Sequence, residues 1–288
     1  MEASRGLEIE KKYDVDAGAA VPDLAQAPGV ARAGKPHTDL LEAVYFDTPE
    51  HLLAARRVTL RRRTGGKDAG WHLKLPPQAA GAPGDEPQQR TELHAPLGRP
   101  DVVPDSLLIH LHAYLRGAVP VPVVRLETRR TTYPLYAENG VHLADLADDQ
   151  VTAERLKGGA GEETGGGTAR QEWREWELEL VHGTTDLFGP VEELLAAAGA
   201  RPAAHASKLA RALGSGTTDA GQSSPALLAG KRAPAAAVVT VYVARQIEQI
   251  LATDAAVRQE ERDAVHAMRS ATRRIRSVLA AYGRLYRA

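Results

Sequence analysis

The stretches Glu8-Ile9-Glu10-Lys11-Lys12 and Glu175-Trp176-Glu177-Leu178-Glu179-Leu180 largely alternate charged with apolar residues. Successive side chains of an extended strand point to opposite faces, so each stretch predicts a strand with one charged face. The same pattern recurs in Leu60-Arg61-Arg62-Arg63, Trp71-His72-Leu73-Lys74-Leu75 and Arg90-Thr91-Glu92-Leu93. An ordinary antiparallel sheet with one solvated side would also alternate in this way.

The chemistry of the charged faces points beyond a solvated sheet. These faces carry pairs of Glu together with Arg and Lys, and few Thr, Ser or Gln. Pairs of carboxylates bind hard cations such as Mg²⁺, and Arg and Lys at alternate positions suit phosphate oxygens. Together they predict a site that holds a polyphosphate and its metal.

Composition narrows the class of protein. The 288 residues suit about one large or two small domains. With 36 basic and 37 acidic residues, the net charge of −1 gives no global field for nucleic acid, and we expect no such partner. The absence of cysteine excludes disulfides, thiolate zinc sites and a Cys nucleophile. A charged N-terminus and the lack of a long apolar run predict a cytoplasmic protein with neither a secretory signal nor a membrane span.

Strand patterns separated by Pro- and Gly-rich turns fill residues 7–180. The predicted strands are Val44–Pro49, Arg57–Arg63, Gly70–Leu75, Thr91–Ala95, Pro122–Tyr136, Gly140–Leu146 and Gln171–Val181. Gly65-Gly66 predicts a hairpin turn. A loop, a flexible insertion and a short helix are predicted at Ala79–Pro87, Gly158–Gly167 and Asp105–Leu115. Seven or more antiparallel strands must close over their charged face to make a site, and a barrel-like tunnel does this.

Helical patterns follow. They predict helices at Asp186–Ala198 and from His205, with Ser207 near the second N-terminus, then a linker at Gly214–Ala233 and a helical end opened by Pro234. The last part carries an apolar stripe of Val265, Met268, Thr272, Ile275, Leu279 and Tyr282. A basic face of about 80° lies beside it, formed by Arg262, His266, Arg269, Arg273 and Arg276. That face either borders a groove or is simply solvated.

In this order the segments resemble the CYTH domain, the triphosphate tunnel metalloenzyme family, over residues 5–214. The resemblance is carried by the charged strands quoted above, Tyr45-Phe46-Asp47-Thr48, an acidic turn at Ala147–Asp149, and Ser207-Lys208. After a flexible linker at 215–236, residues 237–288 resemble the N-terminal part of a CHAD domain, on the segment from Val265 to Ser277. The resemblance implies an α+β chain, an eight-stranded antiparallel β tunnel with a C-terminal α-helical extension.

The resemblance also implies roles for individual residues. The catalytic set would be Glu8, Glu10, Lys12 and Glu92, with Glu92 balancing charge or positioning water and metal. Phosphate oxygens would be bound by Lys12, Arg61, Arg63, Lys74, Arg90, Arg130 and Lys208, with Arg129 as the alternative to Arg130. The metal would be held by Glu8, Glu10, Glu177 and Glu179, with Asp145 or Asp148 as weaker candidates. On the helical extension, polyphosphate would be bound by His266, Arg269, Arg273 and Arg276.

The implied activity is hydrolysis of inorganic triphosphate or short-chain polyphosphate, dependent on Mg²⁺ or Mn²⁺. Two alternatives stay open: a thiamine or nucleoside triphosphatase or adenylyl cyclase of the same fold, and a non-catalytic polyphosphate-binding module. The many Glu residues argue against the module, because an anion binder gains nothing from carboxylates. Two short helices are marginal alone, so we expect them to pack on the tunnel or on a second chain in a homodimer.

Overall fold

The computed structural model describes residues 3–76, 87–156, 170–214 and 234–286. Three sequence predictions therefore fall almost wholly outside the described residues, with only Pro87 and Gly214 inside them: the loop at 79–87, the insertion at 158–167 and the linker from 214 to 233.

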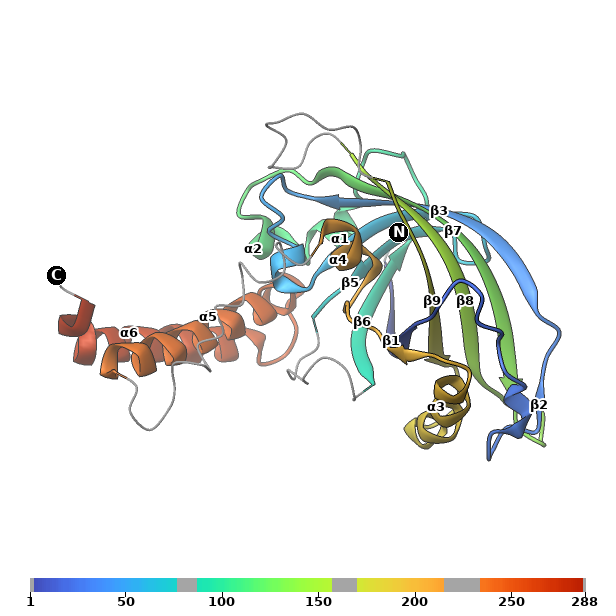
Figure 1. The fold of residues 1–288 in the computed structure, drawn as a ribbon. Coiled ribbons are helices and arrows are strands. Elements are labelled where there is room, and N and C mark those ends of the chain that lie inside the picture. The colour runs from blue at the N-terminus through green and yellow to red at the C-terminus, as the bar shows by residue number, and fades with distance from the viewer. Residues whose placement is uncertain (1–2, 77–86, 157–169, 215–233, 287–288) are drawn as a thin grey trace.

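Eight antiparallel strands close into a barrel (Figure 1). They are β1 (Ser4–Asp14), β3 (His37–Asp47), β4 (Thr59–Thr64), β5 (Gly70–Lys74), β6 (Gln88–Ala95), β7 (Val121–Tyr136), β8 (His142–Arg155) and β9 (Arg170–Leu180). Their order is β1-β6-β5-β4-β3-β7-β8-β9, and β9 pairs back onto β1 to complete the ring. Two short strands, β2 (Arg32–Ala33) and β10 (Arg201–Pro202), add to β7 and β1. The predicted eight-stranded barrel is confirmed.

The barrel buries apolar side chains outside its wall and charged side chains inside. Trp176 and Leu178 of β9 pack outward against η3 (Thr185–Leu187) and α3 (Phe188–Ala197). Trp71 and Leu73 of β5 pack outward against α1 (Asp105–Leu108) and α2 (His112–Leu115). Because outward and inward residues alternate along a strand, covering the apolar face with helices commits the charged face to the interior.

One end of the barrel interior is apolar and is closed by helix α4 (Lys208–Leu213). Leu209 and Leu213 pack there against Tyr45, Leu126 and Val151 from three strands. The side chain of Ser207 caps the helix by accepting a hydrogen bond from the Ala210 N–H at 3.1 Å. A Ser N-cap of this kind stabilises a short helix by about 1 kcal/mol. The helix expected from His205 therefore begins three residues later, at Lys208, with Ser207 as its N-cap, and this start positions Lys208 at the tunnel.

A buried carboxylate fixes the chain after β3. Asp47 accepts backbone hydrogen bonds from Thr48, Leu53 and Ala54 at 2.7, 2.9 and 2.9 Å. These bonds organise the turn that contains η2 (Ala54–Arg56). Elsewhere, η1 (Leu24–Gln26) is capped by Asp23.

Several sequence predictions differ from the observed elements, and two of them differ in the kind of element. The segment Ala147–Asp149, expected as a turn, lies within the continuous strand β8, where it pairs residue by residue with both β7 and β9. The single helix expected at Asp105–Leu115 is two short helices, α1 and α2, separated at residues 109–111.

The C-terminal extension consists of α5 (Ala235–Arg258), α6 (Ala264–Tyr282) and the short η5 (Gly283–Tyr286), and it projects away from the barrel (Figure 1). Leu251 of α5 packs against the α1–α2 cluster, and Glu248 pairs with Arg56. The residues of α6 that are buried are Ala264 and Ala271, whereas Val265, Leu279 and Tyr282 of the predicted stripe are exposed. Small alanine side chains on α6 allow α5 and α6 to approach closely. The predicted apolar stripe of α6 is therefore not the face that packs against α5.

By length and composition, α5 is long and apolar enough to cross a membrane, and core helices of soluble proteins meet the same criterion. The sequence expectation of no long apolar run is corrected here, because the Ala- and Val-rich start of α5 carries few charges. The absence of a membrane partner stays a prediction.

Candidate functional site

The inward faces of the strands surround one charged cavity. Seven cations line it: Lys12, Arg61, Arg63, Lys74, Arg90, Arg130 and Lys208. Six acids lie among them, and only Tyr45, Thr59 and Ser207 complete the lining. The acids are Glu8, Glu10, Asp68, Glu92, Glu177 and Glu179. Every phosphate-binding residue predicted from the sequence thus faces one space of about 80 Å³.

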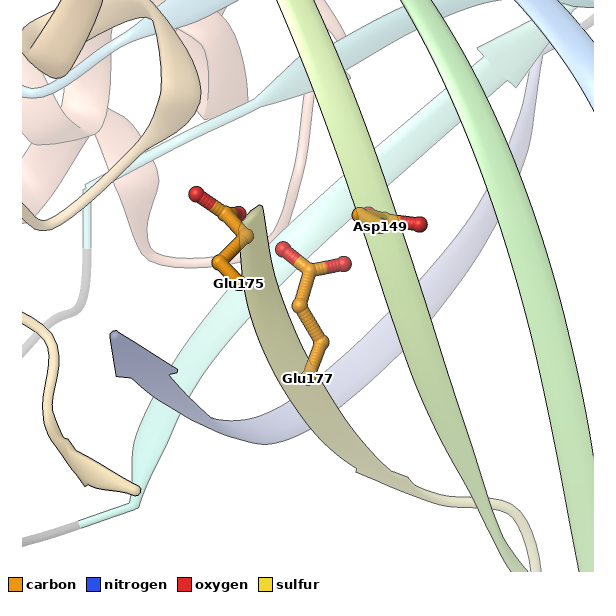
Figure 2. A group of neighbouring side chains, drawn as sticks. All are labelled: Asp149, Glu175 and Glu177. Atoms are coloured by element: carbon orange, nitrogen blue, oxygen red, sulfur yellow. The ribbon is translucent and has the colours of Figure 1, made fainter. Parts of the chain in front are cut away.

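The first of two carboxylate clusters, here the α4-side cluster, consists of Asp149, Glu175 and Glu177. Figure 2 shows Glu175 and Glu177 on β9 and Asp149 on the neighbouring β8. All three are buried, and one oxygen from each lies within 4.8 Å of the others. Such oxygens suit a hard cation, so this triad has the donor set of a metal site.

Protein cations already balance the α4-side cluster. The Lys208 ammonium lies 2.9 Å from Asp149 Oδ2, 2.7 Å from Glu175 Oε1 and 2.7 Å from Glu177 Oε1. Arg130 donates two hydrogen bonds to Asp149, at 2.7 and 2.6 Å, and Lys12 pairs with Glu177. Although burial acts to raise the pKa of Glu177, its cationic partners Lys12, Lys208 and Arg130 hold it well below its usual value. Three protein cations therefore match the three carboxylates of this cluster.

The second cluster, here the β1-side cluster, consists of Glu8, Glu10 and Glu179 and has excess negative charge. Lys74 pairs with Glu8, and Lys12 lies 3.0 Å from Glu10 but is shared with Glu177. Glu8 Oε2 and Glu10 Oε1 are buried without a hydrogen-bond partner among the described residues.

The pKa values of the β1-side cluster reflect this excess of charge. Burial, together with the negative charges of Glu8 and Glu10, raises the pKa of Glu179 to about 7. Burial and Glu10 also raise the pKa of Glu8. The pKa of Glu10, by contrast, is lowered, because Lys12 and Lys74 outweigh burial. The raised pKa values of Glu8 and Glu179 show that nearby positive charge does not offset the burial of these two carboxyl groups. A divalent cation would supply it, and the unpartnered oxygens are suitable ligands.

The arginines of the cavity keep unpartnered donors for an anion. The buried Nε atoms of Arg61 and Arg63 have no hydrogen-bond partner in the described part of the chain. Arg90 is oriented by a hydrogen bond of 2.8 Å to the Ala206 carbonyl oxygen, just before α4. A buried guanidinium with free N–H groups is suited to phosphate oxygens, which accept several charge-assisted hydrogen bonds.

Some predicted residues lie elsewhere. Asp148 faces outward, where its two oxygens accept bonds from Arg174 at 2.7 and 2.9 Å, and Trp176 donates to it at 3.1 Å. Asp148 therefore does not line the cavity, and strand parity gives the inward position to Asp149. Asp145 is bound by His142 at 2.8 Å, away from the cavity lining. Arg129 is exposed on the outer face, which leaves Arg130 as the cavity residue.

The basic residues of the extension form no part of this cavity. His266, Arg269, Arg273 and Arg276 are all exposed on α6. Their role in binding polyphosphate stays a prediction.

Sequence reasoning missed two inward residues of the α4-side cluster, Asp149 and Glu175. Glu175 shares the parity of Glu177 and Glu179, so the alternation itself was the signal. To identify Asp149 as an inward residue, the pairing register of β8 must be known, because only that register places Asp149 directly opposite both Arg130 and Glu175. Trp173 also faces inward, where its indole N–H donates to Glu175 at 2.6 Å.

Comparison with known families gives two matches. A CYTH domain model matches residues 6–212, and a CHAD domain model matches residues 241–288. Two uncharacterised proteins of Mycobacterium tuberculosis, from strains CDC 1551 and H37Rv, are each 45% identical over 284 residues. The alignment covers 96% of this chain and 52% of each relative, so the chain spans about half the length of these curated relatives.

Solved structures of similar proteins share low sequence identity with the chain. A candidate adenylate cyclase of Bacillus halodurans is 17% identical, with a TM-score of 0.46, over 72% of this chain and 97% of that one. A candidate adenylyl cyclase of Hippeastrum, described as having a dominant triphosphatase activity, is 19% identical, with a TM-score of 0.38, over 72% of this chain and 95% of that one.

Proposed function

The chain belongs to the CYTH domain family, and we propose that its tunnel hydrolyses inorganic triphosphate or short-chain polyphosphate with Mg²⁺ or Mn²⁺. One observation carries the proposal. A single buried cavity places seven cations beside a carboxylate cluster whose negative charge exceeds that of its partners. The cations match a chain of phosphates, and the unbalanced carboxylates match the metal that accompanies it.

The residues divide into two groups. Arg61, Arg63 and Arg90, with Lys12, Lys74, Arg130 and Lys208, would bind phosphate oxygens and hold the chain extended. Glu8, Glu10 and Glu179 would hold the metal, since two of them carry unpartnered buried oxygens. A bound divalent cation would neutralise phosphate charge and lower the pKa of a water molecule. Hydrolysis of a phosphoanhydride needs mainly positioning and charge neutralisation, and these side chains supply both.

The cavity lining favours a bare phosphate chain over a nucleotide. Tyr45 is the sole aromatic residue of the lining and no aliphatic side chain belongs to it, so it offers little surface for a base. Its volume of about 80 Å³ is small beside the ~300–1,000 Å³ of organic-ligand pockets. We therefore expect tripolyphosphate to be preferred over ATP and thiamine triphosphate.

The exposed basic face of α6 extends the proposal. Arg269, Arg273 and Arg276 lie on one side of the helix, within about 80° of each other. We propose that they bind longer polyphosphate outside the tunnel. Substituting all three with Gln would then weaken binding of long polyphosphate while leaving tripolyphosphate hydrolysis unchanged.

The experiment measures phosphate release from tripolyphosphate, ATP and thiamine triphosphate, with Mg²⁺ and with EDTA. Wild type is compared with Glu10→Gln, and Glu127→Gln serves as the control because Glu127 is exposed on the outer face. We expect metal-dependent release that prefers tripolyphosphate, is lost in Glu10→Gln and is retained in Glu127→Gln. Polyphosphate binding without turnover of any substrate would contradict the proposal and support a binding module instead.

A further inference from the structure

His72 is buried in the tunnel wall and has no place in the function proposed above. It is 3% exposed, lies on the inward face of β5 and is absent from the cavity lining. Its Nδ1 is 3.0 Å from Glu92 Oε1, and its Nε2 is 2.9 Å from the Asp68 carbonyl oxygen. Glu92, by contrast, does line the cavity. His72 therefore connects the β4–β5 turn to a carboxylate of the site.

Both neighbours of the His72 ring accept hydrogen bonds. Burial, together with Arg61 and Arg63, lowers the pKa of the His72 imidazole, which favours the neutral ring with one proton. The Glu92 carboxylate is a stronger acceptor than the Asp68 carbonyl oxygen, so the proton is expected on Nδ1. Glu92 is ionised, because Lys74, His72 and Arg61 outweigh burial and hold its pKa well below the usual value. The charged and titratable side chains around the ring are Glu92, Asp68, Arg61, Arg63 and His94.

The ring itself is held in one orientation. His94 packs against it edge-on, with ring centroids 4.8 Å apart. His94 can lie there only because residue 70 is glycine: a Cβ at Gly70 would come within 2.2 Å of His94 Nε2. The Asp68 carboxylate also pairs with Arg63, so the turn is held to the tunnel through two atoms of Asp68. These contacts fix the orientation of the His72 ring and hold Nδ1 toward Glu92.

We propose that His72 is a positioning residue that orients Glu92 toward the attacking water in the tunnel. His72 occupies Glu92 Oε1, and among the described residues Oε2 has no hydrogen bond, so Oε2 can accept one from water. The water oxygen then forms a bond to the terminal phosphorus as the bridging P–O bond breaks. The electron pair of the broken bond stays on the bridging oxygen, which leaves with the shortened phosphate chain. The strongly acidic Glu92 does not keep the water proton, which stays with the orthophosphate formed. The role rests on the proposed hydrolysis.

Two carboxamide variants separate positioning from packing. In His72→Asn the amide nitrogen takes the place of Nδ1 and can still donate to Glu92, whereas in His72→Gln it takes the place of Nε2 and cannot. We expect kcat for tripolyphosphate to fall about threefold in His72→Asn, the effect of one neutral hydrogen bond. In His72→Gln it should fall about 10- to 100-fold with KM unchanged, as when a group that orients a ligand is lost.

A double variant and a spectroscopic measurement complete the test. His72→Gln should cause no further loss in a Glu92→Gln background, because both changes break the same contact. Equal losses in the Asn and Gln variants, or full additivity with Glu92→Gln, would overturn the proposal. Thermal melting of each variant checks that it folds.

Nitrogen-15 NMR of the His72 imidazole is independent of turnover. The signal is assigned among the ten histidines by its loss in His72→Asn. We expect the spectrum of wild type at neutral pH to show a protonated Nδ1, and we expect this signal to weaken in Glu92→Ala. An unprotonated Nδ1 would refute the contact even if the enzyme is active. If wild type hydrolyses no substrate but Nδ1 is protonated as expected, the proposed function fails while the His72–Glu92 contact stands.

Discussion

The two carboxylate clusters of the tunnel lie on the same wall yet differ in how their charge is balanced. Asp149, Glu175 and Glu177 face Lys208, Arg130 and Lys12, with several N–O distances of 2.6–2.9 Å. Glu8, Glu10 and Glu179 share Lys74 and part of Lys12, and the pKa of Glu179 is raised to about 7. The protein's own cations balance the first cluster, whereas under the proposed function the second gains most from a metal. Proximity of carboxylates alone therefore does not identify a metal site; the cations around them decide it.

Removing Lys208 should give the largest effect on stability. Lys208→Met leaves three buried carboxylates without their shared cation, so we expect the free energy of unfolding to fall by about 3–5 kcal/mol. Urea denaturation measures the loss. Lys11→Met is the matched control, because Lys11 pairs with the more exposed Glu192, and an outer pair contributes about 1 kcal/mol or less. Similar losses in the two variants would show that the α4-side cluster is not held by Lys208.

Metal affinity should separate the clusters next. We expect Glu179→Gln to weaken Mn²⁺ binding by at least about 10- to 100-fold, because it removes a ligand rather than an outer partner. Glu175→Gln should change the affinity only a few-fold. Isothermal titration with Mn²⁺ gives both constants. A larger loss in Glu175→Gln would move the metal to the α4-side cluster.

The stability of the protein should depend on pH in a way that reflects the raised pKa of Glu179 in the β1-side cluster. The pKa of Glu179 rises from 4.5 to about 7 on folding, so folded protein holds a proton that the unfolded chain releases. Metal-free protein should therefore lose stability as pH rises from about 4.5 to about 7 and lose no more from this group above it. Each pKa unit corresponds to about 1.4 kcal/mol, and the partial exposure of the Glu179 side chain reduces this value. We therefore expect the free energy of unfolding to fall by about 1–2 kcal/mol.

Thermal melting from pH 4.5 to 8 measures this slope. Glu179→Gln should flatten it, and Mg²⁺ should stabilise wild type more at pH 8 than at pH 5. Stability that rises through the same window in both proteins would contradict the raised pKa.

The smallest expected effect concerns the outward neighbour of the α4-side cluster. Asp148→Asn removes the charge that Arg174 contacts outside the barrel, so we expect a loss of about 1 kcal/mol in unfolding free energy and no change in Mn²⁺ affinity. Chemical denaturation and metal titration of the same sample test both. A lower Mn²⁺ affinity in Asp148→Asn would show that changes on the outer face of the barrel affect the tunnel.

The strand faces could be predicted from sequence because alternation survives in the structure. Arg61 and Arg63 face inward while Arg62 faces outward and donates to the Leu97 carbonyl oxygen, as a two-residue period requires. Local rules also placed Ser207 near the N-terminus of α4. These predictions needed no knowledge of which strands pair.

The rest depended on pairing and packing. Two adjacent aspartates resemble a turn in isolation, but Arg130 and Arg174 on neighbouring strands hold Asp149 and Asp148 on opposite faces of β8. A shift of one residue exchanges the two faces, so no local pattern could choose between Asp148 and Asp149. In α6 the exposed Val265 and the buried Ala264 differ because contact with α5 favours close approach over side-chain size.

The closure of the barrel by its first and last strands has a consequence for how the chain folds. The pair of Lys12 and Glu177 joins residues 165 apart in sequence, and Lys208 arrives later still. During synthesis β1 can pair with β9 only after nearly the whole domain has been made, so its second edge stays uncovered until then. Such distant contacts slow folding, so refolding should be rate-limited by ring closure.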